Sequence, residues 1–98
     1  MRLPVTFRSI AAAEMEEAVD WYKRQRTGLG EEFLAAVEAQ LQIVSEDPFL
    51  LPIVHRDLRQ VHTVRFPYSI IYTVEAERIV VFAVFHGRRD ASIWKKRR

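Results

Sequence analysis

The run Ile79-Val80-Val81-Phe82-Ala83-Val84-Phe85 is the longest apolar stretch in this sequence of 98 residues. It is far shorter than the roughly 20 residues that a membrane-spanning helix needs, and its β-branched and aromatic side chains favour a strand. Both alternating sets of side chains are apolar, so the pattern predicts a strand that is buried on both faces. A sheet that holds such a strand must be covered by other elements on its two sides.

Two more strands are predicted directly before this run. Residues 68–74 alternate between two faces, and residues 60–66 precede them. Phe66-Pro67 gives a tight link between these two strands, and Glu75-Ala76-Glu77 reads as a polar hairpin loop before the last strand. The three strands therefore predict an antiparallel meander.

The first half of the sequence predicts one strand and two helices. Residues 3–8 alternate apolar and polar side chains, which is typical of a strand with one buried face. Ser9 then stands at the N-cap position of a helix that runs from residue 10 to about residue 26. Gly28-Leu29-Gly30 breaks that helix, and an apolar stripe predicts a second one over residues 31–45.

The expected order is β-α-α-β-β-β, with an irregular loop at residues 46–58, where two prolines interrupt the pattern. This order predicts one α+β domain over residues 1–98: a mostly antiparallel four-stranded sheet, two helices on one face and a short C-terminal helix that carries Trp94. Two helices cover only one face. We therefore expect residues 49–51 and Trp94 to cover the other face of the 79–85 strand incompletely, until a partner completes it.

Composition and charge limit the possible function classes. The sequence has no cysteine, and residues 1–5 lack the apolar stretch of a signal peptide, so we expect a cytoplasmic protein without disulfides or membrane contact. Its three histidines lack the spacing of a zinc site and no cofactor motif is present, so we expect neither metal nor cofactor.

The charge is unevenly distributed along the chain. Residues 1–50 hold five basic and nine acidic side chains, a net −4, whereas residues 51–98 hold ten basic and four acidic, a net +6. This asymmetry favours one surface that meets anions.

Several local strings, taken in their order and spacing, carry a resemblance. They are Ala18-Val19-Asp20-Trp21-Tyr22, Gly28-Leu29-Gly30-Glu31-Glu32-Phe33, Asp47-Pro48, Val64-Arg65-Phe66-Pro67-Tyr68, Ile71-Tyr72 and His86-Gly87-Arg88-Arg89-Asp90 with Trp94. Together they resemble the RelE/ParE superfamily of type II toxin–antitoxin toxins, also described as plasmid stabilisation proteins. The resemblance implies a toxin that is neutralised in a hetero-oligomer with a small cognate antitoxin.

The same resemblance separates two kinds of target. RelE-like members cut messenger RNA on the ribosome, whereas ParE-like members inhibit DNA gyrase and cut nothing. The RelE-like site has an arginine after the tyrosine that begins the middle strand; here Tyr68 is followed by Ser69. The late tyrosine of the RelE-like site has no counterpart here, and Trp94 lies near its position. Residues 61–63 occupy the stretch where that site has lysines. Its second arginine, which follows the last strand, can be matched by Arg88 or Arg89. This sequence is therefore closer to the ParE-like members.

The candidate site residues follow from that comparison. If the protein is a nuclease, His86 is the candidate acid or base, and Arg65 and Arg89 are the candidates to hold the phosphate. Candidates for binding the target or the antitoxin are Arg88, Arg89, Trp94, Trp21 and Tyr22. In the alternative interpretation, His86 and Arg89 bind the protein's own backbone or Asp90, and Trp94 packs on the sheet.

Three functions remain open from the sequence. The first is a ParE-like toxin that binds gyrase, the second is a ribosome-dependent endoribonuclease, and the third is a degenerate toxin that is retained to bind antitoxin. None of the three requires a cofactor.

Overall fold

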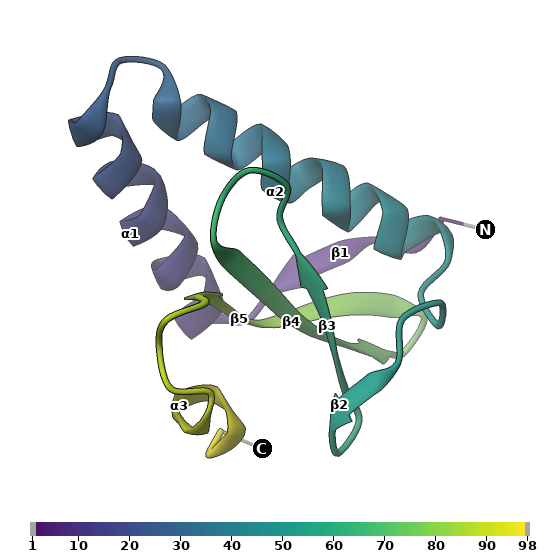
Figure 1. Ribbon diagram of the computed structural model, residues 1–98. Helices are drawn as coiled ribbons and strands as arrows, with labels where there is room; N and C mark the ends of the chain where they lie inside the picture. The colour runs from purple at the N-terminus through teal and green to yellow at the C-terminus, as the bar shows by residue number, and fades with distance from the viewer. Residues whose placement is uncertain (1, 98) are drawn as a thin grey trace.

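A five-stranded sheet, a helical hairpin and a short terminal helix make up the fold. The computed structural model describes residues 2–97 (Figure 1). The elements in chain order are β1 (Val5–Phe7), α1 (Ser9–Gln25), α2 (Leu29–Glu46), β2 (Ile53–His55), β3 (Leu58–His62), β4 (Tyr68–Glu75), β5 (Arg78–His86) and α3 (Ser92–Lys95). The predicted helices, meander and terminal helix are confirmed, but the first strand of the meander covers Leu58–His62 rather than residues 60–66. The N-cap of α1 is Arg8 rather than Ser9, and it makes no side-chain cap hydrogen bond.

The sheet corrects the expectation of four mostly antiparallel strands. Its order is β1-β5-β4-β3-β2, and β1 runs parallel to β5. Two backbone bonds fix this pairing: Ile79 N–H donates to the Pro4 carbonyl (2.8 Å) and Arg8 N–H donates to the Val81 carbonyl (3.0 Å). The pairing is non-local, so no pattern inside residues 3–8 could give its direction.

The fifth strand lies in the segment that we expected to be an irregular loop. β2 pairs with β3 in an antiparallel ladder that is interrupted by an irregularity between Ile53 and His55. Three residues with a bulge carry too little periodic signal to predict a strand, and edge strands in proteins are often short and irregular.

The central strand β5 is buried on both faces, as predicted, but not by simple alternation. Its pairing with β4 shifts register, because Ile71 pairs with Ala83 and Tyr72 with Val81. Phe82 is thus the extra residue of a bulge, which turns Phe82 and Ala83 toward the same side of the sheet. The result is two apolar cores, one on each face of β5.

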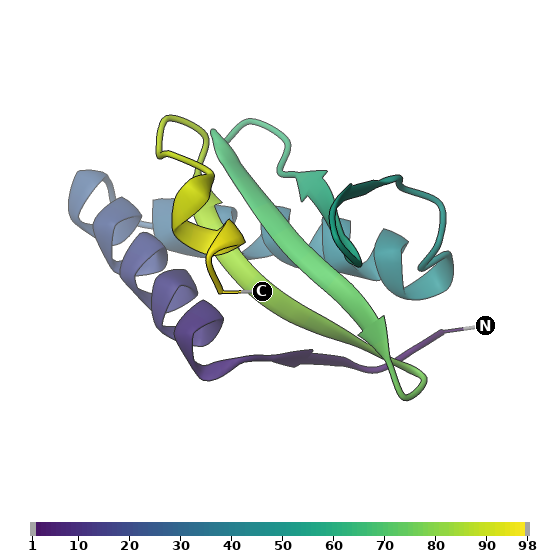
Figure 2. The same cartoon turned by 90° about the horizontal axis from the view of Figure 1, so that it is seen from below.

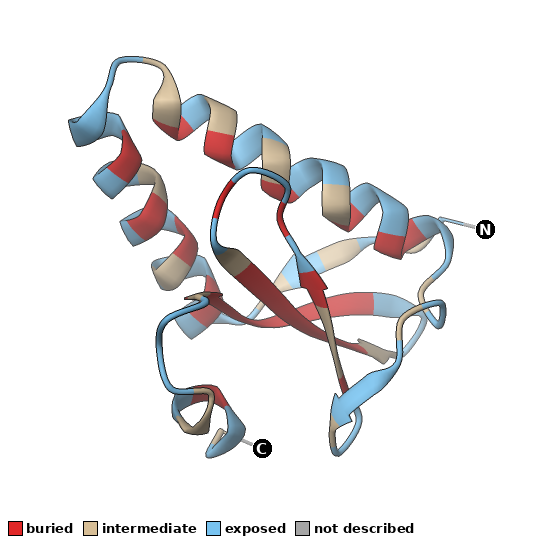
Figure 3. Ribbon diagram, in the orientation of Figure 1, coloured by how far each residue is buried: buried red, intermediate tan, exposed pale blue. Residues whose placement is uncertain are grey.

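Different elements cover the two faces. The hairpin of α1 and α2 packs on the core that contains Ile79, Val81 and Val84. On the opposite face, α3 lies across β4 and β5 (Figure 2), where Trp94 joins a second core with Phe82 and Phe85. Residues 79–85 are all buried (Figure 3). The expectation that this face would be covered incompletely is therefore wrong, because one large indole fills the space above the bulge.

Where β1 ends, the carboxylate of Glu14 takes over as a hydrogen-bond acceptor along the edge of β5. Within residues 2–97, β1 pairs with β5 only as far as Val81, and beyond that point Glu14 of α1 accepts the Val84 N–H (3.0 Å). The same carboxylate receives two N–H bonds from Arg97 (3.2 and 2.9 Å). The Glu14 and Arg97 side chains are only 14% and 18% exposed. This contact anchors the segment that follows α3.

We predict that Glu14→Ala lowers the free energy of unfolding by about 1.5–3 kcal/mol, since it removes an acceptor of charge-assisted bonds and leaves the Val84 amide without one. Arg97→Ala should cost less, and the double variant should show positive coupling. Urea denaturation measures each variant. The control is Arg2→Ala, which breaks the exposed Arg2–Glu46 pair (3.5 Å) and should change stability little. Equal effects of Glu14→Ala and Arg2→Ala would contradict the anchor.

Candidate functional site

A cleft of about 380 Å³ opens on the α3 side of the sheet. Gln60 and His62 of β3, Ser69 of β4, and Arg89, Trp94 and Lys95 of the C-terminal segment line it. Strands β3 and β4 pair His62 with Ser69 directly, and Gln60 lies two residues earlier on the same side of β3. Strand pairing therefore brings these polar side chains together although they are distant in sequence.

Three of these side chains form one hydrogen-bond chain. Gln60 Nε2 donates to Ser69 Oγ (3.0 Å), and Ser69 Oγ lies 2.8 Å from His62 Nδ1. In one tautomer of His62 the Ser69 hydroxyl donates to Nδ1, and in the other Nδ1–H donates to the second lone pair of Ser69 Oγ. Ser69 is buried, whereas His62 is exposed.

Sequence reasoning missed this chain. It treated Ser69 only as the replacement of an arginine, and it named His62 only as a further candidate beside Arg65, His86, Arg88 and Arg89. The available signal was the polar alternation of Gln60 and His62 in a predicted strand. That signal becomes informative only when the register places Ser69 opposite His62.

A second concave region lies on the α1 side, where β4 and β5 meet the first helix. It consists of two neighbouring pockets of about 320 and 360 Å³, and both are lined by Trp21, Tyr68 and His86. Arg89 lines the first of them and also the cleft under α3. Burial raises the pKa of the Tyr68 hydroxyl; the Tyr22 phenol raises it further, and the Arg89 charge opposes this.

His86 holds the turn that presents the two arginines. Its Nδ1 accepts the Arg88 N–H (3.0 Å), and its carbonyl accepts the Arg89 N–H (3.0 Å). Its ring lies edge-on to Tyr68 with the ring centroids 5.3 Å apart. Arg88 and Arg89 are exposed. His86 therefore binds its own backbone, as the alternative interpretation held, while its Nε2 takes no part in that turn.

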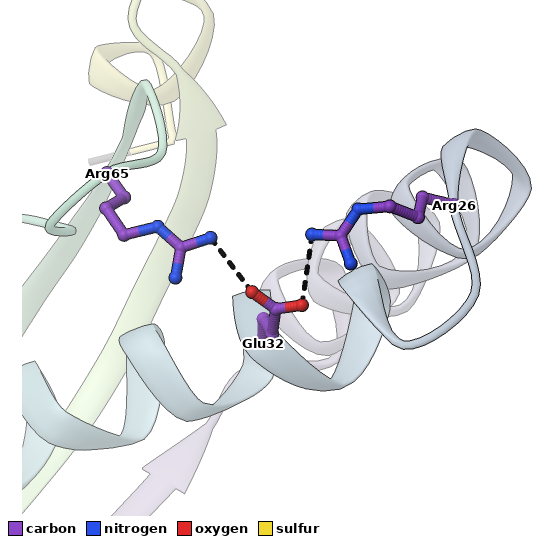
Figure 4. A network of polar contacts seen from close by, with 3 residues as sticks. All are labelled: Arg26, Glu32 and Arg65. Carbon is purple, nitrogen blue, oxygen red and sulfur yellow. Dashed lines mark hydrogen bonds and ion pairs between the residues drawn. The ribbon is translucent and has the colours of Figure 1, made fainter.

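Arg65 belongs to a different network. Its Nη2 donates to Glu32 Oε1 of α2 (2.9 Å), and Arg26 donates to the other carboxylate oxygen (3.1 Å), as Figure 4 shows. The hydrogen bond from Arg65, followed by that from Arg26, lowers the pKa of the Glu32 carboxyl. The structure thus brings His86, Arg88 and Arg89 together at the end of β5 and places Arg65 against the helical hairpin.

The aromatic candidates differ in accessibility. Tyr22 and Trp94 are buried, whereas Trp21 is 48% exposed beside Tyr68 and His86. Asp90, a possible internal partner of Arg89, accepts the Ser92 N–H at the start of α3 (2.9 Å), and this backbone bond lowers its pKa. Of the three aromatic residues, Trp21 is therefore the one best placed to meet another molecule.

Within residues 2–97, no three histidine, cysteine or acidic side chains gather as metal ligands would. Nor is any helix there long and apolar enough to cross a membrane.

Comparison with known proteins gives a family and a fold. The profile of the family described as "ParE toxin of type II toxin-antitoxin system, parDE" matches residues 5–91. Among solved structures, the chain is similar to one from the chromosomal ParDE system of P. aeruginosa, with 16% identity, a TM-score of 0.72 and coverage of 87% of this chain and 96% of that one. It is also similar to one from the toxin–antitoxin complex RelBE2 of Mycobacterium tuberculosis, with 18% identity, a TM-score of 0.60 and coverage of 88% and 99%. No curated protein sequence matches the chain.

We predict that Glu32→Gln lowers the melting temperature near neutral pH but not in acid. A lowered folded-state pKa means that ionised Glu32 stabilises the fold above its ordinary value of 4.5, and that this contribution is lost as the pH falls through the lower folded value. Thermal unfolding at about pH 7 and about pH 3 measures the difference.

Glu31→Gln is the matched control, because Glu31 shares the first turn of α2 but is exposed outside this network. Solvent screening keeps the expected effect of Glu32→Gln small. An effect of Glu32→Gln that is the same at both pH values would show that its ion pairs do not contribute.

Proposed function

The chain belongs to the ParE toxin family of type II toxin–antitoxin systems, and we propose that it inhibits growth by binding a cellular target such as DNA gyrase until a cognate antitoxin neutralises it. The observation that carries the proposal is the surface at the end of β5. There His86 holds the turn in which Arg88 and Arg89 are exposed, and Arg89 lines a pocket together with the half-exposed Trp21.

Binding is favoured over cutting by what occupies two positions of the RelE-like site. Ser69 stands where the resemblance predicts an arginine, and its hydroxyl is buried between Gln60 and His62. Trp94 lies near the position of the late tyrosine and is only 2% exposed. Neither side chain supplies a charge or an accessible proton donor to a scissile phosphate.

The exposed surface at the end of β5 has the composition of a protein-binding site. Arginine and tryptophan are enriched among the residues that contribute most to binding energy in protein interfaces. Arg89 and Trp21 supply such side chains in the lining of the pocket at Tyr68 and His86, and Arg88 is exposed in the adjoining turn.

A ribosome-dependent endoribonuclease is the second candidate, because one observation favours it. His86 and Arg89 line the same pocket, which joins a possible proton carrier to a possible phosphate ligand. Arg65, the third member of the expected set, is engaged with Glu32 instead.

The helical hairpin offers a separate place for the antitoxin. A groove of about 300 Å³ runs between β1, α1 and α2, and apart from Glu38 its lining is apolar: Phe7, Ala12, Met15, Leu34, Val37 and Leu41. Leu34 is 39% exposed there. We propose that an apolar segment of the antitoxin fills this groove in a hetero-oligomer, in the manner of an amphipathic helix docked between helices.

We expect induction without antitoxin to arrest growth with altered DNA supercoiling while messenger RNA stays intact. The double variant Arg88→Ala/Arg89→Ala should lose toxicity and keep cooperative unfolding, since exposed substitutions cost within about 0.5 kcal/mol. The control is Arg2→Ala/Arg78→Ala, which removes the same charge from exposed positions outside the proposed surface. Rapid cleavage of translated messages would favour the nuclease, and a chain without toxicity would favour a degenerate toxin.

In the groove proposed for the antitoxin, Leu34→Asp should weaken antitoxin binding by roughly tenfold or more, because it places a charge in an apolar contact. Ile43→Asp is the matched control, because Ile43 is also an exposed apolar residue of α2 (49%). It lies on the opposite side of the helix, since residues in a helix advance by roughly 100° each. Calorimetric titration measures both variants, and equal affinities would place the antitoxin elsewhere.

A further inference from the structure

One of the two pockets on the α1 side is lined only by aromatic rings and a proline. It has a volume of about 360 Å³, and its lining consists of Trp21, Tyr22, Pro67, Tyr68 and His86. Neighbouring rings are steeply inclined to one another: 87° between Trp21 and Tyr22, 63° between Tyr22 and Tyr68, and 76° between Tyr68 and His86. Rings at such angles form the walls of a box, which we call the aromatic box.

The charges around the aromatic box favour a neutral occupant. Aromatic rings bind cations on their faces, and they also pack edge-to-face against other aromatic rings. Burial and the Tyr22 phenol raise the pKa of Tyr68, the Arg89 charge lowers it, and Glu17 has the smallest of these effects. Arg89 is therefore the charge that acts most strongly on Tyr68, and it would repel a cation held there. An aromatic side chain carries no charge and can make the edge-to-face contacts.

The adjoining pocket, of about 320 Å³, offers hydrogen-bond donors to a carboxylate. His86 Nδ1 accepts the Arg88 N–H (3.0 Å), and a backbone N–H can only donate. The His86 ring is therefore neutral and carries its proton on Nε2. The same ring and the guanidinium of Arg89 line this pocket. A carboxylate there can accept from both, and bonds of this kind to a charged group are the strong ones.

The charged side chains that line this adjoining pocket also favour an anion. Arg24 and Arg89 contribute two positive charges. Glu14 belongs to the lining as well, but it is paired with Arg97 (2.9 Å), whereas Glu17 carries the opposing charge. The balance is positive, so a carboxylate from a partner meets a complementary charge.

We propose that this pair of pockets binds an aromatic side chain of the target protein together with a neighbouring carboxylate. The aromatic ring occupies the aromatic box, and the carboxylate accepts from His86 Nε2 and from Arg89. The half-exposed Trp21 lets a partner reach the box from outside. The inference rests on the target-binding function proposed above and adds the chemistry of the partner, an acidic segment that exposes one aromatic residue.

The test is an NMR titration of the purified, nitrogen-labelled chain, in which only its own amide and indole signals are observed. The probe is a capped pentapeptide, Gly-Asp-Trp-Asp-Gly, and we expect it to shift the indole signal of Trp21 and the amide signals of Arg88 and Arg89. Replacing its tryptophan by leucine should weaken binding about fivefold, and replacing both aspartates by asparagine should weaken it about tenfold.

Two further ligands test other occupants. A pentapeptide with lysine in place of tryptophan tests a cation, and adenosine monophosphate tests a nucleotide. Binding of either one as tightly as the probe would overturn the proposal. A probe that shifts no signal at millimolar concentration would overturn it as well.

Variants of the chain locate the binding. Trp21→Ala should weaken probe binding about tenfold, and Trp21→Phe should restore most of it. Ile10→Ala is the matched control, because Ile10 is 47% exposed on the same helix and lies outside both linings. Arg89→Ala should weaken binding about tenfold, whereas the exposed Arg78→Ala should not. Glu17→Gln should tighten binding about twofold, because it removes the opposing charge. Equal affinities of Trp21→Ala and Ile10→Ala, or a weaker Glu17→Gln, would refute the assignment.

Growth arrest separates this inference from the function on which it rests. Trp21→Ala should abolish arrest and leave antitoxin binding unchanged. Full arrest by Trp21→Ala would overturn the inference while the toxin function stands, and loss of antitoxin binding instead of arrest would assign the aromatic box to the antitoxin and overturn it too. If the unaltered chain arrests no growth, the proposed function fails, and the titration still decides what the two pockets bind.

Discussion

Burial of β5 on both faces is the constraint on which the rest of this structure depends. The hairpin of α1 and α2 covers one face, and Trp94 of the short helix α3 covers the other. The bulge at Phe82 keeps the second core small, because it places Phe82 and Ala83 together beneath Trp94. A short helix then suffices where a second pair of helices would otherwise be needed. A four-residue helix is unstable alone, so its position rests on Trp94 and on the bond from Arg97 to Glu14.

The same arrangement distributes the charges. Acidic residues of the helices take up two arginines from the basic half of the sequence, Glu14 binding Arg97 and Glu32 binding Arg65. The turn after β5 keeps Arg88 and Arg89 exposed, and Lys95 lies on the adjoining α3. The net charge of the chain is only +2, but the turn after β5 and the neighbouring α3 form a locally basic surface.

Local periodicity predicted the elements whose partners are near in sequence. The helices, the β3-β4-β5 meander and the packing of Trp94 all follow from patterns within a few turns of chain. The parallel pairing of β1 with β5 and the edge strand β2 did not follow, because each depends on a neighbour that the local pattern does not specify. The same distinction applies to the candidate site residues. Arg88 and Arg89 were named from a local sequence string, residues 86–90, whereas the contact between His62 and Ser69 depends on the register of two strands.

Position 69 shows how one residue sets the chemistry of the cleft. Ser69 is 3% exposed, and its oxygen lies within hydrogen-bond distance of both Gln60 and His62. A long basic side chain there would have to leave this chain of bonds to reach solvent, because burying an unpaired charge costs far more than a hydrogen bond returns. The position can thus supply either a fixed cation or a neutral anchor for His62, but not both. With serine, the positive charge of the cleft comes from Arg89 and Lys95 of the C-terminal segment, and the bond from Arg97 to Glu14 holds the end of that segment in place.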